Sequence, residues 1–182
     1  MLEVEKTLNK FGTNVKKDAK KNLKSKGALY KSIDYNVKVN RAKPNVPPSF
    51  EFDFVWEDYG TFVDLGVKGI GGTKADGTPW KKKRVVNSPY KYRFPVKKKS
   101  GGGFLLALNG WTIRKSIAPR SSGGQFQKRA GMLRAIRTSI FHTGLETTHF
   151  FTKPFNKYFK TLPDEVLKAY GDDLDIFLKK AL

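Results

Sequence analysis

The chain has 182 residues, of which 38% are hydrophobic and none is cysteine. This length and composition favour one domain with a buried core, and they exclude disulfide scaffolds, thiol catalysis and cysteine-ligated metals. With 36 basic and 16 acidic residues the formal charge is +20, which favours nucleic acid, an anionic membrane or an acidic protein surface as partner. No apolar run reaches the roughly 18 residues of a membrane span, and the N-terminus lacks the basic and apolar regions of a signal peptide. We therefore expect neither a membrane span nor a secretion signal.

The positive charge is concentrated in the middle of the chain. Residues 67–130 contain 16 basic residues and one acid, Asp76, whereas residues 1–66 and 131–182 carry net charges of only +3 and +2. The middle stretch also contains most of the glycine and serine runs that indicate loops. We therefore interpret 67–130 as a long basic arm inserted into a single-domain body made of residues 1–66 and 131–182.

Apolar residues spaced three and four apart predict a helix near the N-terminus. This stripe consists of Leu8, Phe11, Val15, Ala19 and Leu23. Lysines occupy much of the remaining surface, Gly12 is a weak point within the helix, and Gly27 is expected to mark its end.

Two alternating runs predict an antiparallel β-hairpin. Apolar residues alternate with other residues in both runs, at Ile33, Tyr35, Val37 and Val39 and again at Phe50, Phe52, Phe54 and Trp56. Prolines at 44, 47 and 48 predict a long connecting loop between them. Glu51 and Asp53 alternate with the aromatic residues, so we expect both on the solvent face.

The arm itself offers weaker signals. Tyr90–Val96 and Phe104–Leu108 are short strand candidates because each is a brief run rich in apolar residues. Helical spacing returns over residues 125–143, which we predict to form a helix that begins at the end of the arm and continues into the body.

A helix at the C-terminus is the clearest element. Thr161, Pro163 and the acids Asp164 and Glu165 together form a typical helix start. The apolar face that follows consists of Val166, Leu167, Tyr170, Leu174, Phe177, Leu178 and Ala181. The acids Asp172, Asp173 and Asp175 are expected on the solvated face.

The titratable residues do not form a convincing catalytic or metal-binding pattern. His142, Glu146 and His149 would share one face of an unbroken helix, but Gly144 and the neighbouring threonines argue against that helix. A two-metal nuclease needs converging carboxylates, and Asp53, Glu57, Asp58 and Asp64 are close in sequence. Glu51 and Asp53 alternate with the aromatic face, however, so we expect them to point to solvent. No phosphate-binding loop or nucleophilic serine arrangement is present either. We therefore expect a non-enzymatic protein without metal or cofactor.

Cations and aromatic residues alternate in the arm, as in grooves that bind single-stranded nucleic acid by neutralising phosphates and stacking bases. Basic loops also dock onto acidic protein surfaces or stay solvated, so both interpretations remain open. The candidate residues for contact with a partner or with DNA are Lys81, Lys82, Lys83, Arg84, Lys97, Lys98, Lys99, Arg114, Lys115, Trp80 and Trp111.

Three segments resemble motifs of the tailed-bacteriophage neck proteins, also called head–tail connector or tail-completion proteins. Gly27–Ile33 is similar to the family's Gly-x-Leu-x-x-Ser-Ile turn into a strand. Tyr59–Gly66 resembles its Tyr-x-x-x-Val-Glu-x-Gly segment, with Asp64 in place of the glutamate. Phe150–Phe155 resembles its Arg-Pro-Phe segment before the last helix, with lysine in place of the arginine. The family-motif residues, which we interpret as fold-defining, are Gly27, Leu29, Ser32, Tyr59, Val63, Asp64, Gly66, Pro154 and Phe155.

The resemblance implies an α+β fold in which a small, mainly antiparallel sheet is flanked by N-terminal and C-terminal helices. It also implies a structural role in the virion, at the head–tail junction, in a ring of subunits that joins the capsid portal to the tail. The implied partners are copies of the chain itself, portal or adaptor proteins and tail proteins, but no membrane. Portal assemblies enclose DNA, so the basic arm is expected to touch either acidic neighbours or the genome. The protein would be made in the cytoplasm of the host bacterium.

Two other functions remain open. A nucleic-acid-binding protein could use the same arm directly on DNA or RNA, and its affinity would fall steeply with salt. A ribosome- or nucleoid-associated basic protein would normally spread its charge over the body, whereas the body here is only slightly basic.

Overall fold

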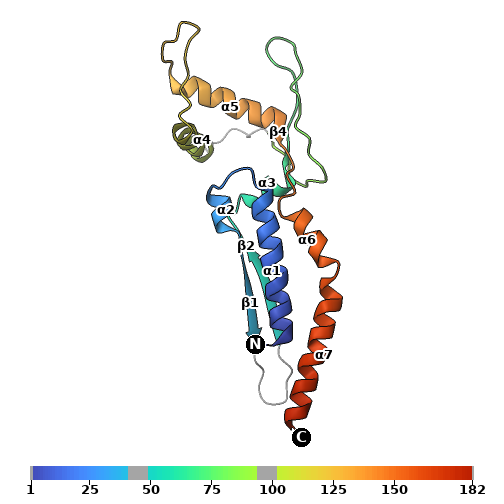
Figure 1. The fold of residues 1–182 in the computed structure, drawn as a ribbon. Helices are drawn as coiled ribbons and strands as arrows, with labels where there is room; N and C mark the ends of the chain where they lie inside the picture. Colours follow the sequence, from blue (N-terminus) through green and yellow to red (C-terminus); the bar gives the residue numbers. More distant parts are fainter. Residues whose placement is uncertain (1, 41–48, 94–101, 182) are drawn as a thin grey trace. The chain divides into compact units, whose positions relative to one another are not determined.

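A computed structural model describes residues 2–40, 49–93 and 102–181, with side chains described except at 102–104 and 175–181 (Figure 1). Contacts divide the chain into two compact units. Unit 1 is Met1–Asp64 with Thr148–Leu182, and unit 2 is Leu65–Thr147. The prolines predicted to form the hairpin connection lie outside the described residues, as do Lys97, Lys98 and Lys99.

Unit 1 confirms the predicted α+β fold of a small antiparallel sheet with helices at both ends of the chain. Its helices and strands are α1 (Glu3–Asn22), α2 (Ala28–Ser32), β1 (Asp34–Asn40), β2 (Ser49–Val55), α3 (Gly60–Leu65, whose last residue belongs to unit 2), α6 (Thr152–Phe159) and α7 (Leu162–Ala181). Strands β1 and β2 form the predicted hairpin, with Val37 opposite Phe52. Alternate residues along both strands are exposed, including Glu51 and Asp53 as predicted.

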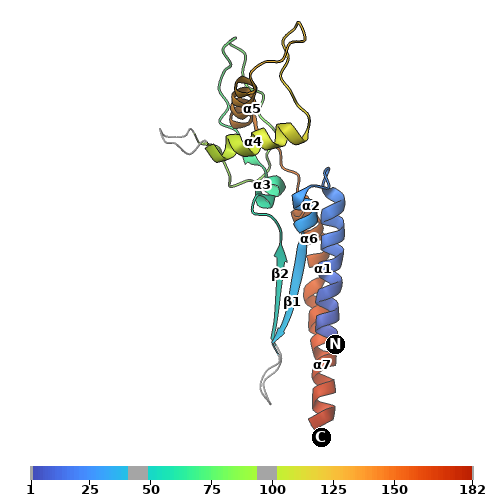
Figure 2. The same ribbon diagram turned by 90° about the vertical axis from the view of Figure 1, so that its left-hand side faces the viewer.

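The core of unit 1 lies between the hairpin and the long helices. Figure 2 shows α1, α6 and α7 on one side of the hairpin. The predicted stripe of α1 is buried there except for Leu23, which is partly buried and lies just after the helix. The centroid of the Phe11 ring lies 5.5 Å from that of Phe52 and 5.8 Å from that of Phe155. Nearer the N-terminus of α1, Val4 and Leu8 pack with Ala169 of α7. Burial of this apolar stripe is the main source of stability for a helix of this kind.

Gly12 lets α1 approach the hairpin closely. A Cβ atom at this position would lie 2.5 Å from a ring carbon of Tyr35, a distance that real side chains do not reach. The glycine that weakens the isolated helix therefore has a packing role in the folded unit. Helix α1 ends at Asn22 rather than at the predicted Gly27, which instead precedes α2.

Asp173 corrects the prediction for the C-terminal helix. We expected this acid on the solvated face, but it is only 4% exposed. Its two carboxylate oxygens accept hydrogen bonds from the backbone N–H groups of Glu3, at 2.8 Å, and Val4, at 3.0 Å. The first turn of α1 has no side-chain cap from its own N-cap residue, so the acid of α7 supplies the acceptors. Leu167 and Leu174, predicted on the apolar face, are 72% and 44% exposed.

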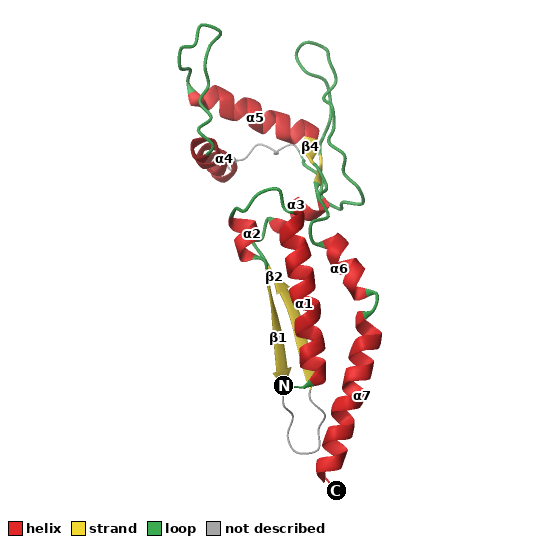
Figure 3. Cartoon of the chain, viewed as in Figure 1, coloured by secondary structure: helices red, strands yellow, loops and turns green. Residues whose placement is uncertain are grey.

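Unit 2 contains β3 (Val67–Lys68), α4 (Gly102–Arg114), α5 (Arg129–Thr143) and β4 (Gly144–Leu145), and β3 pairs with β4 in antiparallel fashion. Figure 3 shows long loops between these elements. Their tips are narrow turns closed by the bridges Thr73–Pro79 and Arg120–Phe126. The strand predicted at Phe104–Leu108 is wrong, because that segment lies within α4. A short apolar run is compatible with either a strand or a buried helix. Here the run is part of a helix of thirteen residues.

Two other predictions for unit 2 differ from the structure in detail. Lys91, in the strand candidate Tyr90–Val96, forms an isolated bridge with Lys68, and residues 94–96 are not described. The helix predicted at 125–143 is confirmed as α5, but it packs against α4 and belongs to unit 2 rather than to the body. In the part of the chain that the structure describes, no helix is both long and apolar enough to cross a bilayer.

The Asp173 cap can be tested by mutation. We expect Asp173→Ala to lower the free energy of unfolding by about 1–3 kcal/mol, because a buried N–H group and a partly buried one lose their acceptors. Asp172→Ala is the matched control, since this neighbouring acid on the same helix is exposed, and we expect a change within about 0.5 kcal/mol. Urea denaturation followed by circular dichroism measures both, and equal effects would contradict the cap.

Candidate functional site

The motif residue Asp64 connects segments that are far apart in the sequence. Its side chain, 5% exposed, accepts hydrogen bonds from the backbone N–H groups of Phe151, at 2.8 Å, and Thr152, at 3.2 Å, and from the Thr152 hydroxyl. Its backbone carbonyl accepts the N–H groups of Thr148, at 3.2 Å, and His149, at 2.9 Å. The carboxylate thus lies at the first turn of α6, where a negative charge is favourable.

The other motif residues of unit 1 lie around the same part of the core. The Tyr59 hydroxyl accepts the Leu29 N–H at 3.0 Å, although the tyrosine ring is 45% exposed. Ser32 donates its hydroxyl to the Leu29 carbonyl at 3.1 Å. Val63 packs against the buried cluster that contains Leu29, and Pro154 is buried in α6. These residues contact one another or the core, as residues that stabilise a fold do.

Two glycines of the motifs lie outside this cluster of contacts. Gly27 precedes α2 and its carbonyl accepts the N–H of Lys31 at 3.2 Å. Gly66 belongs to unit 2 and has a φ of +72°, in the left-handed region. A Cβ atom there would lie 2.7 Å from the Leu145 carbonyl oxygen. The position therefore requires glycine for both conformation and space.

The histidines and Glu146 do not share a helix face. Helix α5 ends at Thr143, so only His142 is helical, while His149 has a φ of +49°. Among the described residues, no three histidine or acidic side chains gather in a way that could hold a metal ion.

The basic run Lys81–Arg84 lies along the end of α5. It has no regular secondary structure, but the Lys83 N–H donates to the Thr143 carbonyl at 2.7 Å and the Thr147 N–H donates to the Arg84 carbonyl at 3.2 Å. All four basic side chains are exposed. The backbone is thus fixed while the four charges point to solvent, an arrangement suited to a polyanion.

The two candidate tryptophans occupy different positions in unit 2. Trp80 stacks on His142, with ring centroids 5.1 Å apart and planes 13° apart, and the Lys74 ammonium lies 5.4 Å from the Trp80 ring. Trp111 is 41% exposed on α4, whose last turn leads to the exposed Arg114 and Lys115. Only Trp80 is therefore next to the basic run.

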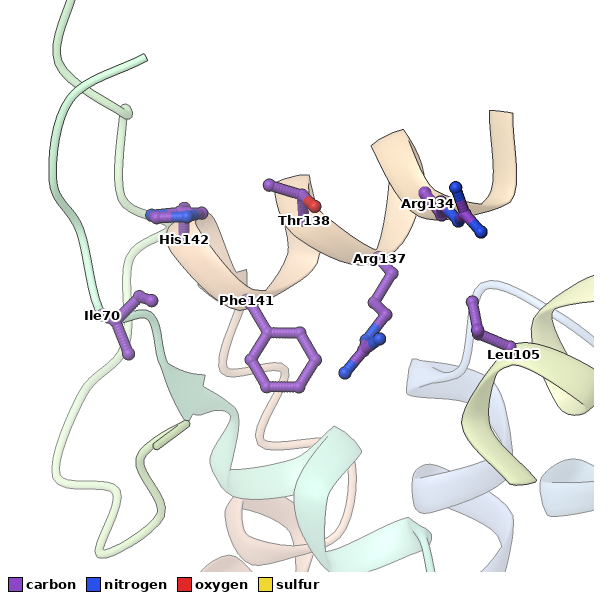
Figure 4. A pocket seen from close by; sticks show the side chains of 7 residues that line it. All are labelled: Ile70, Leu105, Arg134, Arg137, Thr138, Phe141 and His142. Atoms are coloured by element: carbon purple, nitrogen blue, oxygen red, sulfur yellow. The ribbon is translucent and has the colours of Figure 1, made fainter. Parts of the chain in front are cut away.

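A pocket beside the basic run was not predicted from the sequence. It has a volume of about 350 Å³ and is lined by Ile70, Leu105, Arg134, Arg137, Thr138, Phe141 and His142. Five of these come from α5, and Figure 4 shows Arg137 and Phe141 on the side of the helix that faces Ile70 and Leu105. The Arg137 guanidinium lies 5.4 Å from the Phe141 ring centroid. Spacings of three and four in the predicted helix could have revealed this basic and aromatic face.

The electrostatic surroundings of the pocket are strongly positive. Unit 2 has 18 basic and two acidic residues, a net charge of +16, whereas unit 1 has a net charge of +4. One of the acids, Asp76, accepts hydrogen bonds from the Thr78 hydroxyl and N–H, which lower the pKa of its carboxyl group. The other acid, Glu146, is exposed and does not line the pocket. Among the described residues, neither Arg134 nor Arg137 forms an ion pair with a carboxylate.

Asp64 provides a direct test of the contact between the motif segments. We expect Asp64→Ala to destabilise the protein by about 1–3 kcal/mol, because it leaves the partly buried donors at the start of α6 without an acceptor. Asp58→Ala, at an exposed acid just before α3, is expected to change stability by less than about 0.5 kcal/mol. Urea denaturation again provides the measurement, and a neutral Asp64→Ala would show that the contact does not hold the segments together.

The chain matches no protein-family model, no curated protein and no solved structure in the three comparisons made. Its function is therefore inferred from its own residues and contacts.

Proposed function

We propose that the chain is a structural protein of a tailed bacteriophage virion, a neck or tail-completion subunit of the ring between the capsid portal and the tail. The observation that carries this proposal is the meeting of the motif segments. The Gly27–Ile33 segment contacts the Tyr59–Gly66 segment through Leu29 and Tyr59, and the latter contacts Phe150–Phe155 through Asp64. Residues that resemble one family in sequence order thus also form one connected structural feature.

The distribution of charge supports a subunit with two different tasks. Unit 1 has a packed core and a small net charge, as expected for a body that holds its shape within an assembly. Unit 2 carries most of the positive charge and would reach an acidic neighbour or the DNA that passes through the ring. The proposed partners are copies of the chain, portal or adaptor proteins, tail proteins and genomic DNA.

Helix α4 supplies a second reason to expect protein partners. Leu106, Trp111 and Ile113 are 72%, 41% and 57% exposed. Large apolar side chains exposed on one short helix are typical of surfaces that are covered in an assembly. In the proposed ring, a neighbouring protein would cover this helix.

Direct nucleic-acid binding outside a virion is the second candidate function. It is favoured by the density of basic residues in unit 2 and by the exposed side chains of Lys81–Arg84. Such a protein would bind DNA or RNA as a monomer or small oligomer, through contacts that weaken steeply with salt.

Light scattering after size exclusion, on nuclease-treated protein at low and high salt, separates these functions. The neck proposal predicts a closed multimer free of nucleic acid and stable at high salt, since burial of apolar surface does not depend on charge screening. Electron microscopy of this species should show rings with a central channel. A monomer that carries nucleic acid at low salt and releases it at high salt would contradict the ring and favour the second function.

A further inference from the structure

We propose that the pocket on α5 is a binding site for the phosphate backbone of nucleic acid, with Arg134 and Arg137 as its phosphate ligands. The site lies in unit 2 and differs from the basic residues singled out in the sequence. It goes beyond the proposed function by naming a ligand and the residues that hold it, and it rests on that function only for the identity of the nucleic acid as phage DNA.

The helix geometry places the donors together. Residues at i and i+3 are neighbours on a helix surface, so Arg134 and Arg137 are adjacent in the pocket lining, while Figure 4 shows the Thr138 side chain on the other side of the helix from Arg137. The two guanidinium groups offer several hydrogen-bond donors to one or two phosphates. The Phe141 ring beside Arg137 holds that guanidinium by a cation–π contact, with 5.4 Å between the charge and the ring centroid. Part of the entropy cost of ordering Arg137 is therefore met before a ligand binds.

The lining favours a phosphate over other ligands. No carboxylate lines the pocket, and no described carboxylate neutralises either arginine, so an anion would be attracted without competition. Arginine binds phosphate oxygens with two parallel hydrogen bonds, which a point charge such as lysine does not provide. Ile70, Leu105 and Phe141 add an apolar wall of the kind that contacts a sugar or a base.

Neighbouring cations favour a polymer over a single phosphate. The last turn of α5 carries His142, which both lines the pocket and stacks on Trp80. Trp80 is followed directly by Lys81–Arg84, whose backbone is bonded to Thr143 at the end of the same helix. The pocket and the exposed basic run therefore belong to one continuous surface, along which successive phosphates of one strand can be neutralised.

The test compares a pocket variant with a matched charge control. The pocket variant is Arg134→Gln with Arg137→Gln, and the control is Lys91→Gln with Lys128→Gln, which removes the same charge from exposed positions of unit 2 outside the pocket. Fluorescence anisotropy with labelled single-stranded and duplex DNA over a salt series gives the dissociation constant and its salt dependence. Thermal melting confirms that both variants are folded.

We expect the pocket variant to bind at least about tenfold more weakly near physiological salt, because two hydrogen-bonded phosphate contacts are lost. The slope of log affinity against log salt should become shallower by about 2, since each phosphate contact contributes about 0.9. The control should weaken binding by less than about threefold, as expected for charges that only add to the general field. Equal effects of pocket and control variants would overturn the proposal.

Lysine substitution separates the arginine geometry from its charge. Arg134→Lys with Arg137→Lys keeps the charge, so we expect the salt slope to persist while the affinity falls by several-fold. Wild-type affinity in this variant would contradict the bidentate phosphate contact. Polyglutamate serves as the competing polyanion: binding of polyglutamate that is as tight as that of DNA and equally sensitive to the pocket variant would favour an acidic protein ligand and overturn the nucleic-acid assignment.

The result of the DNA-binding test does not depend on whether the protein forms a ring. Light scattering of the pocket variant shows whether the multimer still forms. A normal multimer with unchanged DNA binding would refute only the pocket, whereas pocket-dependent DNA binding by a protein that forms no multimer would refute only the neck function.

Discussion

The hydrogen bonds of Asp64 close unit 1 at the point where the chain leaves it and returns. The Asp64 carbonyl accepts the Thr148 N–H at 3.2 Å, and its carboxylate accepts N–H groups at the start of α6. All of unit 2 lies in the sequence between Asp64 and Thr148. Long insertions cost little additional entropy when their ends are held together, because the closure term grows only with the logarithm of length. The body can therefore accommodate a large cationic insertion while keeping its own core.

Aspartates from distant parts of the sequence cap helices α1 and α6. Features that depend on neighbouring residues could be predicted from the sequence, whereas these caps could not. The stripe of α1, the hairpin and the start of α7 depend on local spacing, so the sequence was sufficient to predict them. The acceptors for the first turns of α1 and α6 come instead from Asp173 and Asp64. No local pattern distinguishes Asp173 from the exposed Asp172 beside it, since only the packing of α7 on α1 buries one of them.

In the candidate site too, features set by neighbouring residues could be predicted, whereas features set by tertiary contacts could not. The exposed charges of Lys81–Arg84 could be predicted from composition, but the pocket requires Ile70 and Leu105 to meet one face of α5. Averaging charge over 131–182 also concealed Arg134 and Arg137, because the acids of the last helix offset them. The structure groups both arginines with the basic segment, so unit 2 combines an exposed basic surface with the pocket that we propose to bind phosphate. In the proposed neck, unit 1 would provide the assembling body and unit 2 the contact with DNA.

We infer that unit 1 is a complete folding body into which the cationic unit is inserted between Asp64 and Thr148. The most direct measurement is urea denaturation, followed by circular dichroism, of a chain in which Leu65–Thr147 is replaced by a short glycine–serine linker. The hydrogen bond between Asp64 and Thr148 shows that such a linker can span the gap. We predict a helical protein that unfolds in one cooperative transition. A chain without helical signal or cooperative unfolding would show that unit 1 depends on unit 2 for its fold, and would contradict the account.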